Sequence, residues 1–205
     1  MKNSIRLAAL LLCIICLSCK NSENGKSQES IQEKMSAYTG SPVSNQFPDI
    51  DNDENEASYS GFCSLLKNKD DGYKFVLKEK DHFKEKGYQL FYFDDDDHKF
   101  YLGAIKSNDE MDILRWRGTN GINYDHTNQD VINKLEEWSK ENPVRIVGVS
   151  FDWVLFNFER PVKDIEQLAK EVYDFCPDVV EQGVGTMDEL KHFIKKENGI
   201  YLWWD

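Results

Sequence analysis

Three carboxylates in the second half of the chain, Asp152, Asp178 and Glu181, are the side chains best suited to acid–base chemistry. Two carboxylates can act as general acid and general base when burial raises the pKa of one of them. Such a pair needs a concave site in which both groups meet. These residue types are therefore compatible with a hydrolase, but they do not indicate its substrate.

Other catalytic or metal-binding arrangements find less support. The four histidines show neither HxH nor HExxH spacing, whereas a zinc site normally needs three or four clustered nitrogen and sulfur ligands. Gly183 to Thr186 (GVGT) could present amide groups to an anion. It lacks the lysine of a phosphate-binding loop and the third glycine of a dinucleotide-binding loop, so a tight turn is expected. We predict no metal and no cofactor.

Cys63 and Cys176 are the cysteines that lie well beyond the start of the chain. Two unpaired and mostly buried thiols are the favoured interpretation. A disulfide between them is the alternative in an oxidising compartment. A reactive thiol would need a nearby histidine, which the sequence cannot place.

A clear succession of elements in the second half must position these residues. We expect a strand at 112–117, a helix at 128–141 capped by Thr127, strands at 144–149 and 153–159, helices at 164–175 and 186–198, and a last strand at 200–204. Two strand–helix–strand units around a hairpin predict a ferredoxin-like split β-α-β arrangement in the C-terminal half. The fold class is α+β, with helices on one face of a mixed or antiparallel sheet. A different mixed sheet built from the same elements is the alternative.

The first half is expected to extend this sheet within a single domain at 59–205. Strands are predicted at 72–78, 87–93 and 99–105, with a short helix at 80–86. Residues 19–58 are rich in Ser, Asn, Gln, Glu and Asp and contain few apolar residues. Such a composition predicts a disordered acidic tether.

The first 18 residues have the features of a signal peptide. Lys2 and Arg6 precede an apolar run at 7–17, which is too short to span a membrane. Ser18-Cys19 at its end resembles the lipobox of bacterial lipoproteins, although Cys16 stands where leucine is usual. The resemblance implies cleavage after Ser18 and a lipid on Cys19 that anchors the chain to a membrane of a bacterial cell envelope. An ordinary secretory signal and an uncleaved anchor are the alternatives.

The charge of the chain limits the classes of molecule that it is expected to bind. It has 37 acidic and 25 basic side chains, a net charge of −12. This balance argues against nucleic acid, whose phosphates need a basic surface, and against a polybasic grip on anionic lipid. It favours a basic protein partner through electrostatic steering and complementarity.

Three stretches together resemble a bacterial family without an established activity, DUF4253. They are Thr119 to Tyr124 (TNGINY), Phe175 to Asp178 (FCPD) followed by Gln182-Gly183 and Gly185-Thr186, and Tyr201 to Asp205 (YLWWD). The resemblance covers about 112–205. It directs attention to the polar residues of these motifs, Asn120, Asn123, Tyr124, Asp178, Gln182 and Asp205. Such residues also satisfy backbone groups at turns and helix ends, which is the structural alternative for each.

The favoured function is a non-enzymatic binding protein, with those polar residues and Asp152 as candidate contacts. Some proteins that resemble this family look like companions of secreted toxins, so an immunity protein that binds a basic partner is one such case. The hydrolase and a structural envelope component are the alternatives. We expect the last strand to be a core element with Trp203 and Trp204 on opposite sides, rather than an exposed recognition tag.

Overall fold

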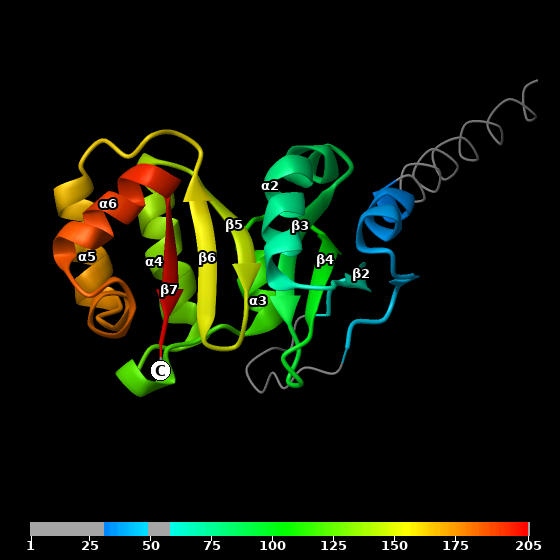
Figure 1. The fold of residues 1–205 in the computed structure, drawn as a ribbon, viewed down its shortest axis with the longest axis horizontal. Coiled ribbons are helices and arrows are strands. Elements are labelled where there is room, and N and C mark those ends of the chain that lie inside the picture. Colours follow the sequence, from blue (N-terminus) through cyan, green and yellow to red (C-terminus); the bar gives the residue numbers. More distant parts are fainter. Residues whose placement is uncertain (1–30, 49–57, 205) are drawn as a thin grey trace, which may run out of the picture.

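A seven-stranded mixed sheet organises the part of the chain that the computed structural model describes, residues 31–48 and 58–204 (Figure 1). Its spatial order is β1-β2-β4-β3-β5-β6-β7. The strands are Val43–Ser44 (β1), Gly61–Leu65 (β2), Tyr88–Asp94 (β3), Phe100–Lys106 (β4), Val144–Val149 (β5), Trp153–Phe158 (β6) and Gly199–Trp203 (β7). β3 and β5 pair in parallel, and the other neighbours pair antiparallel. The sheet therefore consists of two antiparallel halves joined by one parallel pair.

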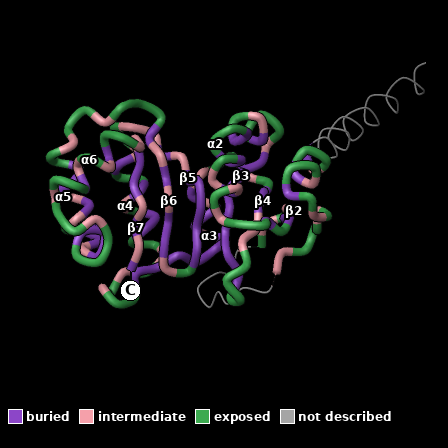
Figure 2. Tube along the Cα trace, in the orientation of Figure 1, coloured by how far each residue is buried: buried purple, intermediate pink, exposed green. Residues whose placement is uncertain are grey.

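Helices cover both faces of this sheet. The named helices are Lys69–Glu85 (α2), Asp112–Arg117 (α3), Ile122–Tyr124 (η1), Asn128–Glu141 (α4), Ile165–Phe175 (α5), Val179–Val184 (η2) and Met187–Glu197 (α6). Along β3, Leu90 and Tyr92 pack into the core under α2, whereas Phe91 and Phe93 pack into the core under α3 and α4. This alternation follows from the pleat of a strand. Figure 2 shows the central strands as the buried part of the molecule.

The predicted α+β class with a mixed sheet is confirmed, and so are most elements of the second half. Thr127 caps α4 with Asp130 as its capping-box partner, and Thr186 caps α6. Asp164 caps α5. These helices begin where the side-chain caps predict, because a cap satisfies amide groups that no helical carbonyl can reach.

The ferredoxin-like arrangement was wrong, because residues 112–117 form helix α3 rather than a strand. The alternation of apolar and polar residues there suits a strand, but Ile113, Leu114 and Trp116 are buried on one side of a helix. β7 pairs directly with β6, where the split arrangement needs an intervening strand. The expectation of helices on one face was also wrong, since α2 lies on the opposite face from α3 and α4.

The strand predicted at 72–78 was wrong as well, because these residues belong to the long helix α2. Asn68 caps this helix by accepting a hydrogen bond from the Asp71 amide. The buried residues Phe75, Val76 and Phe83 recur at helical spacing, which becomes visible only when the two segments 72–78 and 80–86 are joined.

Part of the predicted tether is folded onto the domain. Residues 31–39 form a helix in which Ile31 and Met35 are fully buried, and β1 pairs with β2. The Lys34 ammonium lies 2.7 Å from the Glu79 carboxylate of α2. The disordered tether is thus wrong for residues 31–48, because Ile31 and Met35, one helical turn apart, are buried in the core under α2 although the average composition is polar.

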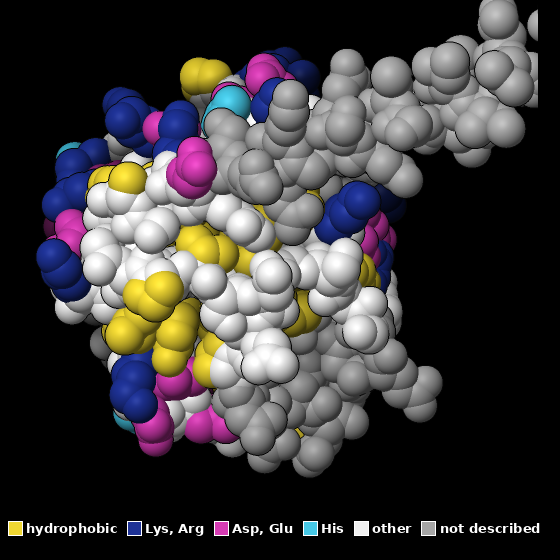
Figure 3. Space-filling model, turned by 90° about the vertical axis from the view of Figure 1, so that its right-hand side faces the viewer, with side chains coloured by type: hydrophobic (Ala, Val, Ile, Leu, Met, Phe, Trp, Pro, Cys, Tyr) yellow, Lys and Arg dark blue, Asp and Glu magenta, His cyan; other side chains and the backbone are white. Residues whose placement is uncertain are grey.

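Figure 3 looks at this side of the molecule and shows hydrophobic side chains in patches among polar ones. Tyr38 and Leu65 from this region are 42% and 41% exposed. The signal peptide at 1–18, Cys19 and residues 49–57 lie outside the described residues. Within the described ranges, no helix is both long and apolar enough to cross a membrane.

Candidate functional site

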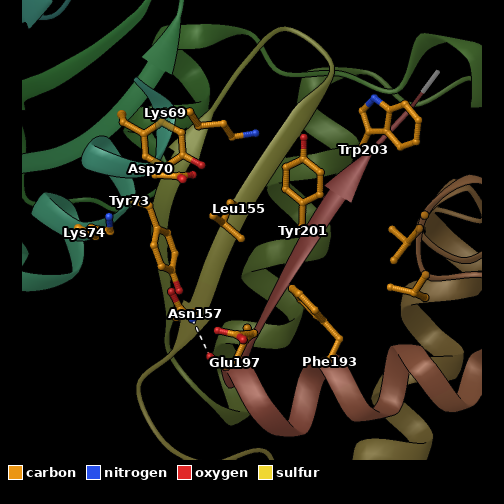
Figure 4. Close-up of a pocket in the computed structure, with 15 residues that line it drawn as sticks. Lys69, Asp70, Tyr73, Lys74, Leu155, Asn157, Phe193, Glu197, Tyr201 and Trp203 are labelled. Atoms are coloured by element: carbon orange, nitrogen blue, oxygen red, sulfur yellow. Dashed lines mark hydrogen bonds between the residues drawn. The ribbon is translucent and has the colours of Figure 1, made fainter. Parts of the chain in front are cut away.

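A pocket of about 440 Å³ lies between α2, strands β6 and β7, and the segment from η2 to α6 (Figure 4). Most of its surface is apolar or aromatic. The lining residues are Lys69, Asp70, Tyr73, Lys74, Tyr92, Leu155, Asn157, Val179, Gly183, Val184, Phe193, Glu197, Gly199, Tyr201 and Trp203. Ligand pockets in proteins have this size range and this mixture of apolar walls with a few polar groups.

The alternation of β7 supplies one wall of the pocket. Tyr201 and Trp203 point to the α2 face and remain partly exposed, whereas Ile200, Leu202 and Trp204 enter the opposite core. The predicted opposition of Trp203 and Trp204 is confirmed. β6 contributes Leu155 to the same wall in register with Tyr201.

One end of the pocket carries a lysine surrounded by rings. The Lys69 Nζ atom lies 4.7 Å from the ring centroid of Trp153 and 5.1 Å from that of Tyr201. Burial lowers the pKa of Lys69, and the charges of Asp94, Asp70 and Asp152 oppose this shift. Burial also raises the pKa of the Tyr201 and Tyr92 hydroxyls. Ammonium and phenol groups therefore face this end as hydrogen-bond donors.

The other end of the pocket is formed by Tyr73, Asn157 and Glu197. The Asn157 side-chain amide donates a 2.9 Å hydrogen bond to the backbone carbonyl of Glu197. Burial, followed by the charge of Glu197, raises the pKa of Tyr73. The hydrogen bond from Asn157 to the Glu197 carbonyl fixes the junction between α6 and β7, at which Gly199 packs against β6.

A second polar cluster lies at η1 and η2. The Tyr124 hydroxyl donates a 2.6 Å hydrogen bond to the Asp178 carboxylate, and the Gln182 amide donates to the same oxygen at 2.9 Å. The hydrogen bond to Asp178 raises the pKa of Tyr124 to about 12. Asp178 itself is 2% exposed. Tyr124 and Asp178 are thus 54 positions apart in the sequence but in direct contact.

These contacts connect the stretches TNGINY and FCPD, and the family model for DUF4253, a domain of unknown function, matches residues 101–205. The chain belongs to the DUF4253 family. The match contains all three stretches that carried the resemblance. Among curated proteins and among solved structures, no match to the chain was found.

The pocket crosses the boundary of the DUF4253 match. Leu155, Phe193, Tyr201 and Trp203 lie inside it, whereas Lys69, Asp70, Tyr73, Lys74 and Tyr92 come from the preceding part of the chain. Sequence reasoning missed these five residues for three reasons. Tyr73 and Lys74 fell in a strand predicted at 72–78, Lys69 and Asp70 fell outside any predicted element, and nothing local linked Tyr92 of β3 to a pocket. The cap at Asn68 and the spacing of Phe75, Val76 and Phe83 are the signals that could have found the helix.

The remaining predicted residues of the DUF4253 motifs are dispersed. The Asn120 side-chain oxygen accepts a 3.2 Å hydrogen bond from the Ile122 backbone amide, so this buried residue shapes the turn before η1. Asn123 is exposed, and Asp205 lies outside the described residues. Asp152 is partly buried in the turn between β5 and β6, where its backbone carbonyl accepts from the Trp204 amide at 3.0 Å.

Two of the three carboxylates proposed for acid–base work, Asp178 and Glu181, both act on Tyr124, whereas the charge of Asp152 acts at the Lys69 end of the pocket. Asp178 binds Tyr124 and Gln182, the Glu181 carboxylate accepts a 2.9 Å hydrogen bond from Tyr173, and the charge of Asp152 acts on Lys69 and Tyr201. None of the three lines the pocket. Among the described residues, no cluster of three or more His, Cys, Asp or Glu side chains could hold a metal ion.

Cys63 and Cys176 are unpaired and buried, as the favoured interpretation predicted. The Cys176 thiol donates to the Trp203 carbonyl at 3.0 Å, and the Cys63 thiol donates to the Gln46 carbonyl at 3.4 Å. Burial raises the pKa of Cys63 to about 12 and that of Cys176 to about 11. Both thiols are therefore protonated near neutral pH and poorly nucleophilic.

Proposed function

We propose that this DUF4253 protein is a non-enzymatic binding protein, attached by a lipid on Cys19 to a membrane of a bacterial cell envelope, that holds a ligand in the pocket between α2 and α6. The pocket is the observation that carries the proposal. It joins apolar walls from β6, β7 and α6 to a few polar groups from α2. A site with this composition is suited to recognition, because apolar contact supplies affinity and the few polar groups supply orientation.

The arrangement of the carboxylates favours binding over hydrolysis. Acid–base catalysis needs two groups within reach of one substrate. Asp178 and Glu181 accept hydrogen bonds from neighbouring side chains, and neither lines the pocket. The hydrolase therefore remains the weaker alternative.

Native mass spectrometry of the full-length chain, purified under mild conditions, tests the binding function. We expect an intact bound molecule at one per chain that is lost when Leu155→Trp fills the pocket. Leu77→Trp is the matched control, because Leu77 belongs to α2, is 49% exposed and does not line the pocket. Equal retention by both variants would contradict the proposal, and so would release of a cleaved product that Asp178→Asn abolishes.

The proposed lipid anchor is based on the sequence of the signal peptide and of Cys19. Lys2, Arg6, the apolar run at 7–17 and Ser18-Cys19 support lipidation of Cys19. The variant Cys19→Ser is expected to leave the membrane fraction and appear in the soluble fraction. Unchanged partitioning of this variant would contradict the lipid anchor.

The net charge of −12 supports a second proposal, that the surface outside the pocket binds a basic protein. An immunity-type protein would require such a partner. Attraction between an acidic and a basic surface speeds association and weakens as salt is added. Surface plasmon resonance against the basic protein captured from the same cells should show an association rate that falls steeply with ionic strength. A rate independent of salt would contradict electrostatic steering.

A further inference from the structure

We propose that the pocket ligand is a small monocarboxylate with an apolar body that carries a ring, held with its carboxylate against Lys69, Tyr92 and Tyr201. This inference rests on the proposed function, since it names the chemistry of what the pocket binds. It is carried by the donors that meet at one end of the pocket and by the apolar surface beyond them.

Three donors at this end have no acceptor. The Lys69 ammonium makes neither a hydrogen bond nor an ion pair with any residue in 31–48 or 58–204, although it is partly buried over the rings of Trp153, Tyr201 and Phe100. The hydroxyls of Tyr92 and Tyr201 likewise have no hydrogen-bond partner in these ranges. Because all three residues line the pocket, an acceptor bound there could pair with these donors. Figure 4 shows the Lys69 amine and the Tyr201 hydroxyl turned toward the same end of the pocket, which Tyr92 also lines.

The apolar surface beyond the donors fits a flat or branched hydrocarbon body. Leu155, Phe193 and Trp203 form its walls, with Val179 and Val184 from η2. A ring between Phe193 and Trp203 would gain aromatic stacking in addition to the burial of its area.

Neighbouring carboxylates limit the ligand to a single negative charge. Asp70, Asp94 and Asp152 act on Lys69, and Asp94 and Asp152 also act on Tyr201. One ligand carboxylate beside Lys69 replaces the water that the ammonium has lost, and it raises the lowered pKa of Lys69 toward its ordinary value. A second negative charge would be repelled by these three aspartates. A cationic head group would lie beside the Lys69 ammonium, and of the three aspartates only Asp70 lines the pocket to offset that repulsion. Both are therefore disfavoured.

Three probes with the same body and different head groups test this chemistry: 4-phenylbutyrate, 4-phenylbutan-1-ol and 4-phenylbutylamine. Binding to the full-length chain is measured by isothermal titration calorimetry. We expect the acid to bind at least about tenfold more tightly than the alcohol or the amine, since a charge-assisted contact contributes about 1.5–3 kcal/mol. Lys69→Met should abolish this preference while leaving the affinity for the alcohol within about twofold.

Two further variants separate a role in binding from a role in folding. Lys78→Met is the matched control, because Lys78 lies on the same helix, has a side chain that is 79% exposed and does not line the pocket. It should bind the acid like the parent chain. Tyr201→Phe keeps the ring and removes one donor, so it should weaken binding of the acid about threefold to tenfold and that of the alcohol less.

The outcomes distinguish this inference from the proposed function. Equal affinity for the acid and the alcohol, or a preference for the amine, would overturn the carboxylate and leave the pocket as a binding site. Equal losses in the Lys69 and Lys78 variants would overturn the role of Lys69. Absence of binding by all three probes would overturn both the ligand class and the pocket as the site of function.

Discussion

The two faces of the sheet differ in how completely helices cover them. On one face, α3 to α6 enclose the strands, and Ile200, Leu202 and Trp204 are at most 2% exposed. On the other, α2 packs over β3, β4 and β5, and β6 and β7 form the pocket wall beside it. Tyr201 and Trp203, which alternate with those core residues along β7, consequently remain partly exposed. One short strand thus belongs to a closed core on one side and lines the pocket on the other.

Trp204 and Trp203 give the most direct test of this difference, because they are adjacent and face opposite sides. Trp204→Ala should lower the free energy of unfolding by about 3–5 kcal/mol, as expected for a large aromatic side chain removed from a closed core. Trp203→Ala should lower it by less than about 2 kcal/mol, because the side chain is only partly buried. Urea unfolding of the full-length chain measures both values. Equal losses would show that the two faces are equally packed.

The two thiols test how well the closed core excludes water and reagents. Cys63 and Cys176 both belong to that core, and their pKa values are raised to about 12 and about 11. At pH 8 a thiol with a pKa of about 11 has roughly one-hundredth of the thiolate of a thiol with a pKa of about 9. Alkylation by iodoacetamide at pH 8 should therefore be at least about 100-fold slower in the folded chain than in urea. Comparable rates would contradict a closed core.

Alanine substitutions at Gly121 and Gly183 compare the free space next to the closed core with the free space next to the pocket. A Cβ atom at Gly121 would lie 2.8 Å from the ring of Trp204, whereas one at Gly183 would meet its nearest atom at 3.4 Å. Gly121→Ala should therefore cost about 1–3 kcal/mol through overpacking, because the buried indole cannot move aside. Gly183→Ala should change stability by less than about 0.5 kcal/mol. Thermal and urea unfolding of both variants measure this difference. Equal losses in the free energy of unfolding would contradict it.

Substitution of Lys69 should have only a small effect on stability. Its ammonium is attracted by the aromatic rings but has lost part of its hydration, and these contributions oppose each other. Lys69→Met should therefore leave the free energy of unfolding within about 1 kcal/mol of the parent while removing the preference for a carboxylate. A loss of several kcal/mol would instead assign Lys69 a structural role.

Much of the C-terminal half could be predicted from the sequence, because its signals are local. The caps at Thr127 and Thr186 and the apolar spacing of α4 and α5 lie within a few residues of one another. The alternation of β7 is equally local, and it predicted that Trp203 and Trp204 face opposite sides.

The candidate site was less predictable, because its residues come together only through tertiary pairing. The DUF4253 motifs drew attention to Tyr124, Asp178 and Gln182, and the structure brings these three together. Nothing local indicated that Lys69 of α2 lies over Tyr201 of β7, more than a hundred positions away. The same holds for residues 31–48, whose helix is stabilised by Glu79 and the core under α2.

The sequence by itself therefore determined the α+β class, the helices with strong caps, the DUF4253 motifs and the faces of the last strand. Local hydrogen bonds and the periods of helix and strand act over a few residues, so a single chain records them. Only the tertiary structure decided that 112–117 is a helix, that β3 and β5 pair in parallel, and that α2 lies beside an uncovered part of the sheet. Those features depend on which distant apolar surfaces bury one another, and that choice is made by the whole core at once.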